Sequence, residues 1–124
     1  MKNLNLLVVE GNIQKENESF KQHGIPTHSE SLKESLSYYT NELNIDVFNP
    51  CSEKSFDKIL TRIKKYHGLI WGGSSLNIYN DTPEIRRQIY FMKECFKRVK
   101  NIFAICWGMQ VAVTAAGGIV RKSI

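Results

Sequence analysis

Apolar residues gather into four short runs along this chain, and each run has the length expected of a buried strand. The runs are Leu4 to Val9, Ile45 to Phe48, Leu69 to Trp71 and Ile102 to Ile105. Short apolar runs followed by turn residues such as Gly, Asn or Pro are typical of strands inside a sheet. The first run lacks alternation of polar and apolar residues, which predicts a strand buried on both faces.

A helix is expected after residue 30, because the apolar positions there return every three or four residues. These positions are Leu32, Leu36, Tyr39 and Leu43. Ser31 and Glu34 have the spacing of a capping box, which predicts that the helix begins there. The preceding segment, residues 12–30, is mainly polar and is expected to be a long loop with a helical turn at most.

Three further helices are expected between and after the remaining runs. Apolar spacing predicts one over residues 56–63, and Thr82 with Pro83 provides an N-cap and a first helical residue for the next. The last helix, Gly108 to Ala116, is stopped by Gly117 and Gly118. Strands and helices therefore alternate, which predicts an α/β fold with three α/β/α layers and a mainly parallel sheet.

Length and composition favour one globular domain, or part of one, in a chain of 124 residues with 42% hydrophobic residues. The longest apolar stretch, Ile102 to Met109, is far shorter than the ~20 residues of a membrane span. The N-terminus lacks the pattern of a signal peptide. Three cysteines without a C-x-x-C pair disfavour a disulfide scaffold or a zinc site, so we expect a cytoplasmic protein with no metal or cofactor.

The net charge of +5 comes largely from one segment, since six Lys and Arg residues lie between Arg86 and Lys100. A basic patch for nucleic acid is one interpretation. The solvated side of one amphipathic helix is the favoured interpretation, so no nucleic-acid partner is expected. The apolar side of that helix is then Ile85, Ile89, Met92, Phe96 and Val99.

Chemistry is expected at the turns after the strands, because ligands of parallel sheets bind at the carboxyl ends of the strands. Cys106 stands between a strand and a helix, as in a nucleophile elbow, where the helix N-terminus favours a thiolate. The N–H of Trp107 and one from Gly72-Gly73 would face a developing oxyanion. Taken singly, Cys106 is typical of a buried core residue, and Gly72-Gly73 is typical of an ordinary turn. Because both follow predicted parallel strands, their joint placement favours a functional site. Cys51 and Cys95 are assigned no catalytic role.

These motifs resemble those of a known family. Cys106-Trp107-Gly108-Met109-Gln110 resembles the C-x-G-x-Q nucleophile motif of class I (triad) glutamine amidotransferases. Residues 71–74 resemble the oxyanion loop of that family, and residues 75–79 resemble its glutamine-pocket segment. Within the family, the chain is most similar to stand-alone GMP synthase-like proteins, which share the A-A-G-G stop at residues 115–118. The resemblance implies a flavodoxin-like α/β/α fold.

The resemblance also implies hydrolysis of L-glutamine to glutamate and ammonia through a thioester on Cys106. The oxyanion would be held by the N–H groups of Gly73 and Trp107. The residues implied in substrate binding are Gly72, Ser75 and Gln110. Ammonia would pass to an acceptor, such as a nucleotide, on a synthetase partner.

One part of the family pattern is missing, because neither His nor Glu follows Cys106, whereas the family has an H-x-E motif downstream. His67 precedes a strand, at the wrong edge of the sheet for catalysis. His23 and His28 lie in the polar segment, and we do not expect His28 to replace the missing base. The chain is therefore expected to be the N-terminal part of a longer domain, and the 124-residue chain to have little or no activity. A natural short form is the alternative.

Two other functions fit the pattern less well. A PfpI-like cysteine hydrolase would explain Cys106 and Glu10, but Trp107 stands where that group often has a His. A non-catalytic pseudo-amidotransferase would use the basic helix to dock a partner.

Overall fold

A parallel sheet of four strands forms the centre of the molecule. The computed structural model describes residues 4–39 and 42–121. The strands are β1 (Leu4–Val9), β2 (Leu43–Phe48), β3 (Gly68–Trp71) and β4 (Ile102–Ala104). They pair in the order β2-β1-β3-β4, and every neighbouring pair is parallel. The predicted α/β fold is confirmed.

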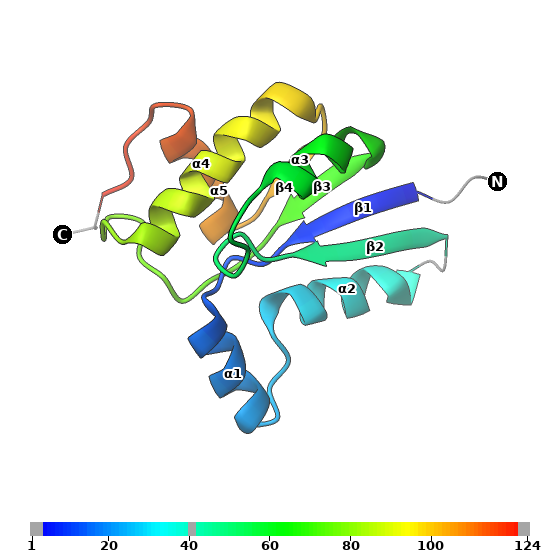
Figure 1. Cartoon of the computed structure of the whole chain (residues 1–124). Helices are drawn as coiled ribbons and strands as arrows, with labels where there is room; N and C mark the ends of the chain where they lie inside the picture. Colours follow the sequence, from blue (N-terminus) through cyan, green and yellow to red (C-terminus); the bar gives the residue numbers. More distant parts are fainter. Residues whose placement is uncertain (1–3, 40–41, 122–124) are drawn as a thin grey trace.

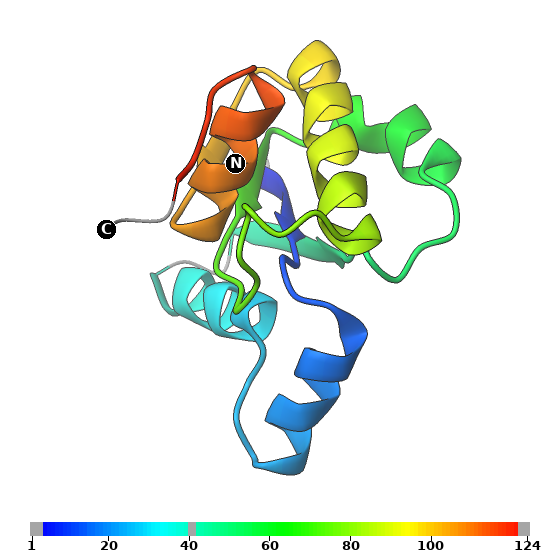
Figure 2. The ribbon, with the colours of Figure 1, turned by 90° about the vertical axis from the view of Figure 1, so that its left-hand side faces the viewer.

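Helices cover both faces of this sheet (Figures 1 and 2). The helices are α1 (Gln14–Gln22), α2 (His28–Tyr39), α3 (Asp57–Arg62), α4 (Pro83–Arg98) and α5 (Trp107–Ala115). α2 packs on β1 and β2 from the side opposite α3, and α5 packs against α4 and β4. None of the helices in residues 4–39 and 42–121 has the length and apolarity needed to cross a membrane.

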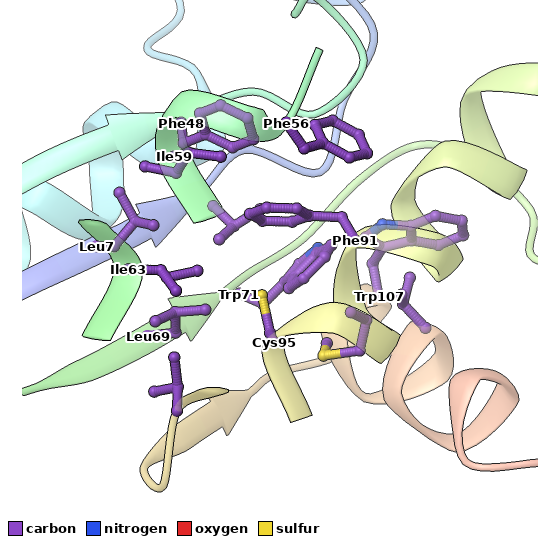
Figure 3. Close-up of a cluster of buried hydrophobic side chains, with 14 of the residues drawn as sticks. Leu7, Phe48, Phe56, Ile59, Ile63, Leu69, Trp71, Phe91, Cys95 and Trp107 are labelled. Atoms are coloured by element: carbon purple, nitrogen blue, oxygen red, sulfur yellow. The ribbon is translucent and has the colours of Figure 1, made fainter. Parts of the chain in front are cut away.

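The main core lies between the sheet and the layer of α3 and α4 (Figure 3). Leu7 and Trp71 point into it from neighbouring strands, and Phe91 of α4 packs against Trp71 with ring centroids 5.8 Å apart. Val8 is also fully buried but is not part of this cluster, because alternate residues of a strand point to opposite faces. It therefore faces the layer that contains α2.

The prediction for residues 12–30 was wrong. This segment contains α1, which buries none of its own residues and therefore has no apolar periodicity to detect. α2 begins at His28 and not at Ser31. Its N-cap is Thr27, whose carbonyl accepts a hydrogen bond from Ser31 N at 3.0 Å and whose Oγ1 accepts one from Glu30 N at 3.3 Å. Thr27 and Glu30 have the spacing of a capping box, and the Thr27 hydroxyl also donates to Glu30 Oε1 at 3.0 Å. The side chain of Tyr39, expected on the apolar stripe, lies outside the described residues.

The start of α4 was predicted correctly, since the Thr82 hydroxyl accepts a hydrogen bond from Ile85 N and Pro83 is the first helical residue. Its buried side differs from the predicted one. Phe96 is 43% exposed, whereas Gln88 and Cys95 are fully buried. The helix is rotated relative to the predicted stripe, which brings a polar amide into the core.

Candidate active site

Cys106 lies between β4 and α5, at the edge of the sheet where the strands end. Its backbone has φ 52° and ψ −108°, and within the described residues no other non-glycine residue has a positive φ. This conformation is strained for a residue with a β-carbon, and such strain often accompanies a functional side chain that the surrounding structure holds in place. The Cys106 thiol is exposed. The strand-to-helix turn therefore presents the thiol at the carboxyl edge.

Gly108 allows the first turn of α5 to pack closely against the end of β3. Its N–H donates to the carbonyl of Gly72 at 3.2 Å, and a β-carbon added at Gly108 would lie 2.2 Å from the carbonyl oxygen of Trp71. No residue larger than glycine fits against that carbonyl. This close approach brings Cys106 beside the Gly72-Gly73 loop.

The two residues expected to supply oxyanion donors are Gly73 and Trp107. Gly73 follows β3 by two residues, and Trp107 is the first residue of α5. In the part of the chain that the structure describes, neither the N–H of Gly73 nor that of Trp107 donates a hydrogen bond to a protein acceptor. Gly73 lines the cavity beside Cys106, whereas Trp107 is buried and does not line it.

A cavity of about 450 Å³ opens beside Cys106, between the first two turns of α2 and the loop after β3. Its lining residues are His28, Ser31, Leu32, Ser35, Gly72, Gly73, Ser74, Ile105 and Cys106. Three of the residues expected in a site, namely Gly72, Gly73 and Cys106, thus meet in one cavity. Ser75 and Gln110, the other two residues expected to contact substrate, do not line it.

His28 lies in this cavity, where the sequence did not lead us to expect it. A β-carbon at Gly73 would lie 3.1 Å from His28 Nδ1, so the imidazole packs directly against the Gly-Gly loop. Phe20 of α1 contacts the ring edge-on, with centroids 5.7 Å apart. The Thr27–Glu30 capping spacing was the available signal, because it places the start of α2, and His28 with it, at the carboxyl edge. His67 lies at the opposite edge, where its Nδ1 accepts a hydrogen bond from Asn5 N at 2.9 Å.

Glu10 anchors the wall of the cavity to the end of β1. Its carboxylate is buried, with 3% of the residue exposed. It accepts hydrogen bonds from Asn12 N at 3.2 Å, from Ser29 N at 3.1 Å and from the Ser29 hydroxyl. Because Ser29 follows His28, these contacts hold the first turn of α2, and thus the imidazole, at a defined place above the sheet.

Asn12 anchors the opposite wall. Its side-chain oxygen accepts hydrogen bonds from Ser74 Oγ at 2.7 Å, from Ser75 N at 3.0 Å and from Ser75 Oγ at 3.1 Å. The Ser75 hydroxyl is therefore used to hold the loop after β3. Gln110 donates its backbone N–H to the carbonyl of Cys106 at 3.2 Å, and this bond closes the first turn of α5.

The other two cysteines are in different environments. Burial raises the pKa of the Cys95 thiol from its ordinary value of 9.0 to about 12. Burial also raises the pKa of Cys51, against the smaller effect of a hydrogen bond from Gln88. Cys106 is the exposed thiol of the described chain. Thiolate chemistry at neutral pH is therefore disfavoured at Cys51 and Cys95.

Four of the cations of α4, namely Arg86, Arg87, Lys97 and Arg98, have partners within the chain. Glu94 pairs with Lys97 and Arg98, and Asp81 pairs with Arg86. Arg87 donates to backbone carbonyls of the 50–53 loop and lies over the Phe56 ring, 4.7 Å from its centroid. These contacts oppose part of the positive charge of the helix.

The chain is similar to known proteins over nearly its whole length. Residues 26–124 match the family model described as Glutamine amidotransferase class-I. The gamma-glutamyl-L-1-hydroxyisopropylamide hydrolase of a Pseudomonas species is 31% identical to this chain over 123 residues. The alignment covers 99% of this chain and 41% of the relative, so the chain spans about two fifths of the length of the curated relative it matches.

Proposed function

Because the chain belongs to the class-I glutamine amidotransferase family, we propose that Cys106 is the nucleophile of a site that hydrolyses γ-glutamyl amides. The observation that carries the proposal is the strained, exposed Cys106 at the start of α5, in one cavity with Gly72 and Gly73. The helix N-terminus favours the thiolate form at this position.

The reaction proceeds in two steps. The Cys106 thiolate attacks the γ-carbonyl carbon, so a carbon–sulfur bond forms and the carbonyl oxygen becomes an oxyanion, which accepts hydrogen bonds from Gly73 N and Trp107 N. The carbon–nitrogen bond then breaks, the amine takes a proton from water and leaves, and a γ-glutamyl thioester remains. Water attacks the thioester, the carbon–sulfur bond breaks, and glutamate and the free thiol are released.

Two classes of γ-amide suit this mechanism. Glutamine itself would release ammonia, which in the GMP synthase-like subtype would pass to a synthetase. The name of the Pseudomonas relative indicates an N-substituted γ-glutamyl amide. We propose that the cavity also accepts such amides, because its α2 wall combines the apolar Leu32 with the hydroxyls of Ser31 and Ser35.

Turnover by the 124-residue chain itself is expected to be slow or absent. Within the described residues, no hydrogen bond joins His28 to Cys106, and no other imidazole lines the cavity. The thiolate can attack the γ-carbonyl carbon, but the thioester forms only when the amine leaves, and protonation of that amine lacks an oriented acid. Measurable glutamate release that disappears in Cys106→Ala would contradict this expectation.

The proposed nucleophile can be tested without turnover, by reacting the purified chain with a γ-glutamyl chloromethyl ketone and, separately, with iodoacetamide. We expect the glutamine-like reagent to modify Cys106 selectively, with a rate that saturates with reagent and falls in excess glutamine. Peptide mass spectrometry locates the modified residue. Cys106→Ala should lose the labelling, and Cys51→Ser, the matched control, should keep it. Equal preference for iodoacetamide and for the γ-glutamyl reagent would contradict a γ-glutamyl site.

A further inference from the structure

Gln88 is a fully buried amide in the middle of α4, surrounded by apolar core residues. Its Oε1 accepts hydrogen bonds from the indole N–H of Trp107 at 2.9 Å and from that of Trp71 at 3.3 Å. Its Nε2 donates to the carbonyl of Gly11 at 2.7 Å and to Cys51 Sγ at 3.3 Å. One side chain thus makes four hydrogen bonds in a place where a helix would ordinarily present an apolar residue.

The partners of Gln88 come from segments that are far apart in the sequence but lie beside the candidate site. Gly11 follows β1, Trp71 ends β3 immediately before Gly72, and Trp107 comes directly after Cys106. Both indoles lie in the cluster around Phe91 (Figure 3). A single amide therefore fixes the end of β3, the start of α5 and the turn after β1 relative to one another.

Trp107 connects this network to the chemistry. Its indole is clamped between Gln88 and Gly11, since a β-carbon at Gly11 would lie 2.6 Å from Trp107 Cδ1. The N–H of the same residue is a proposed oxyanion donor, and its peptide bond begins at Cys106. Holding the indole therefore limits rotation of the peptide that carries both the nucleophile and the donor.

We propose that Gln88 is a positioning residue for the nucleophile turn, an inference that rests on the proposed function of Cys106. Through the two indoles it keeps the Trp107 N–H and the Gly73 N–H in the relative arrangement that one oxyanion requires. The amide suits this task because its oxygen accepts from two N–H donors while its nitrogen donates to Gly11 O. A methionine of similar length would leave both indoles and the Gly11 carbonyl without these partners.

The test compares Gln88→Met, Trp107→Phe and the double variant in the full chain, with Cys51→Ser as the matched control. Cys51→Ser alters a contact of Nε2 and leaves both indole bonds to Oε1. For each variant, the rate of Cys106 modification by the γ-glutamyl chloromethyl ketone is divided by its rate with iodoacetamide, which needs no oxyanion donor. We expect Gln88→Met to lower this ratio about 10- to 100-fold, and to lower it much less in the Trp107→Phe background. Cys51→Ser should leave the ratio unchanged.

A conservative variant separates positioning from general packing. In Gln88→Glu, a protonated carboxyl can accept from the indoles and donate to Gly11 O, whereas an ionised one cannot donate. The ratio should therefore recover at acidic pH and fall as the pH rises, relative to wild type at the same pH. A Gln88→Met variant that unfolds more easily but keeps the wild-type ratio would overturn the inference and leave Gln88 a structural residue.

A second measurement distinguishes failure of this inference from failure of the proposed function. If the wild-type chain shows no preference for the γ-glutamyl reagent, the proposed function fails, and the amide signals of Gly73 and Trp107 in ¹⁵N NMR spectra still report on positioning. Gln88→Met should shift both signals, and Cys51→Ser should shift neither. Unchanged Gly73 and Trp107 signals in a folded Gln88→Met variant would contradict the positioning role of Gln88, regardless of the labelling rates with the γ-glutamyl reagent.

Discussion

Cys106 and Gly108 depend on each other although they have different roles. Cys106 adopts a positive φ that exposes its thiol, and this turn exists because α5 approaches the end of β3 closely. Gly108 permits that approach, since only a hydrogen atom fits between its Cα and the Trp71 carbonyl. The strained backbone of Cys106 therefore depends on glycine at residue 108.

Gly108→Ala should destabilise the protein by about 1–3 kcal/mol, because a new β-carbon 2.2 Å from a backbone oxygen forces α5 away from β3. Urea denaturation followed by tryptophan fluorescence measures the change in the free energy of unfolding. Gly68→Ala is the matched control, because a β-carbon there meets nothing closer than 3.4 Å. Equal effects of the two substitutions would show that the approach of α5 to β3 is not the reason for glycine at residue 108.

The start of α2 illustrates how one helix end shapes the candidate site. The Thr27 capping box ends the preceding loop, and the Glu10 carboxylate ties the next residues to the end of β1. His28 lies between these two anchors and therefore reaches the cavity. A helix that began at Ser31 would leave the imidazole on a loop.

Thr27→Ala should lower the free energy of unfolding by about 1 kcal/mol, because the Glu30 N–H loses its capping acceptor. Ser31→Ala is the control, since Ser31 is exposed within the helix and no cap depends on its hydroxyl. Thermal or urea unfolding of both variants gives the comparison. A larger loss of unfolding free energy in Ser31→Ala than in Thr27→Ala would favour Ser31 as the N-cap, as expected from the sequence, and contradict Thr27.

At the scale of the whole molecule, burial of ionisable groups makes stability depend on pH. Burial raises the pKa of Cys95 to about 12, and burial together with a hydrogen bond to Asp46 raises the pKa of Tyr66 to about 12. The ordinary values, 9.0 for Cys and 10.0 for Tyr, apply in the unfolded chain. The folded state therefore holds these protons more tightly than the unfolded state does, and this favours folding most below about pH 9.

The free energy of unfolding should therefore decrease as the pH rises from about 9 towards 12. Urea titrations at a series of alkaline pH values measure this decrease. Cys95→Ala, compared with wild type across the same series, should show a shallower decrease, because the variant lacks one of the two groups. A stability that stays level over this pH range would contradict both the burial of the Cys95 thiol and the effect of the hydrogen bond from Tyr66 to Asp46.

Local sequence patterns were enough to predict the strands, most helices and the turn that carries Cys106. Each of these features depends on residues close together in the chain: an apolar run, an N-cap, or a glycine after a cysteine. α1 was missed because it buries no residue of its own, and α2 was placed late because two capping boxes compete within eight residues, Thr27 to Glu34.

The sequence by itself determined the alternation of strands and helices, the parallel sheet and the identity of the exposed nucleophile candidate. Only the tertiary structure decided which residues surround that cysteine. His28 reaches the cavity because β1 and α2 are joined through Glu10, and Gln88 is buried because its four partners converge from residues 11, 51, 71 and 107. The periodicity of apolar residues shows which side chains of one helix or strand share a face. The hydrogen bonds named above join residues at least 17 positions apart, so no local pattern predicts them.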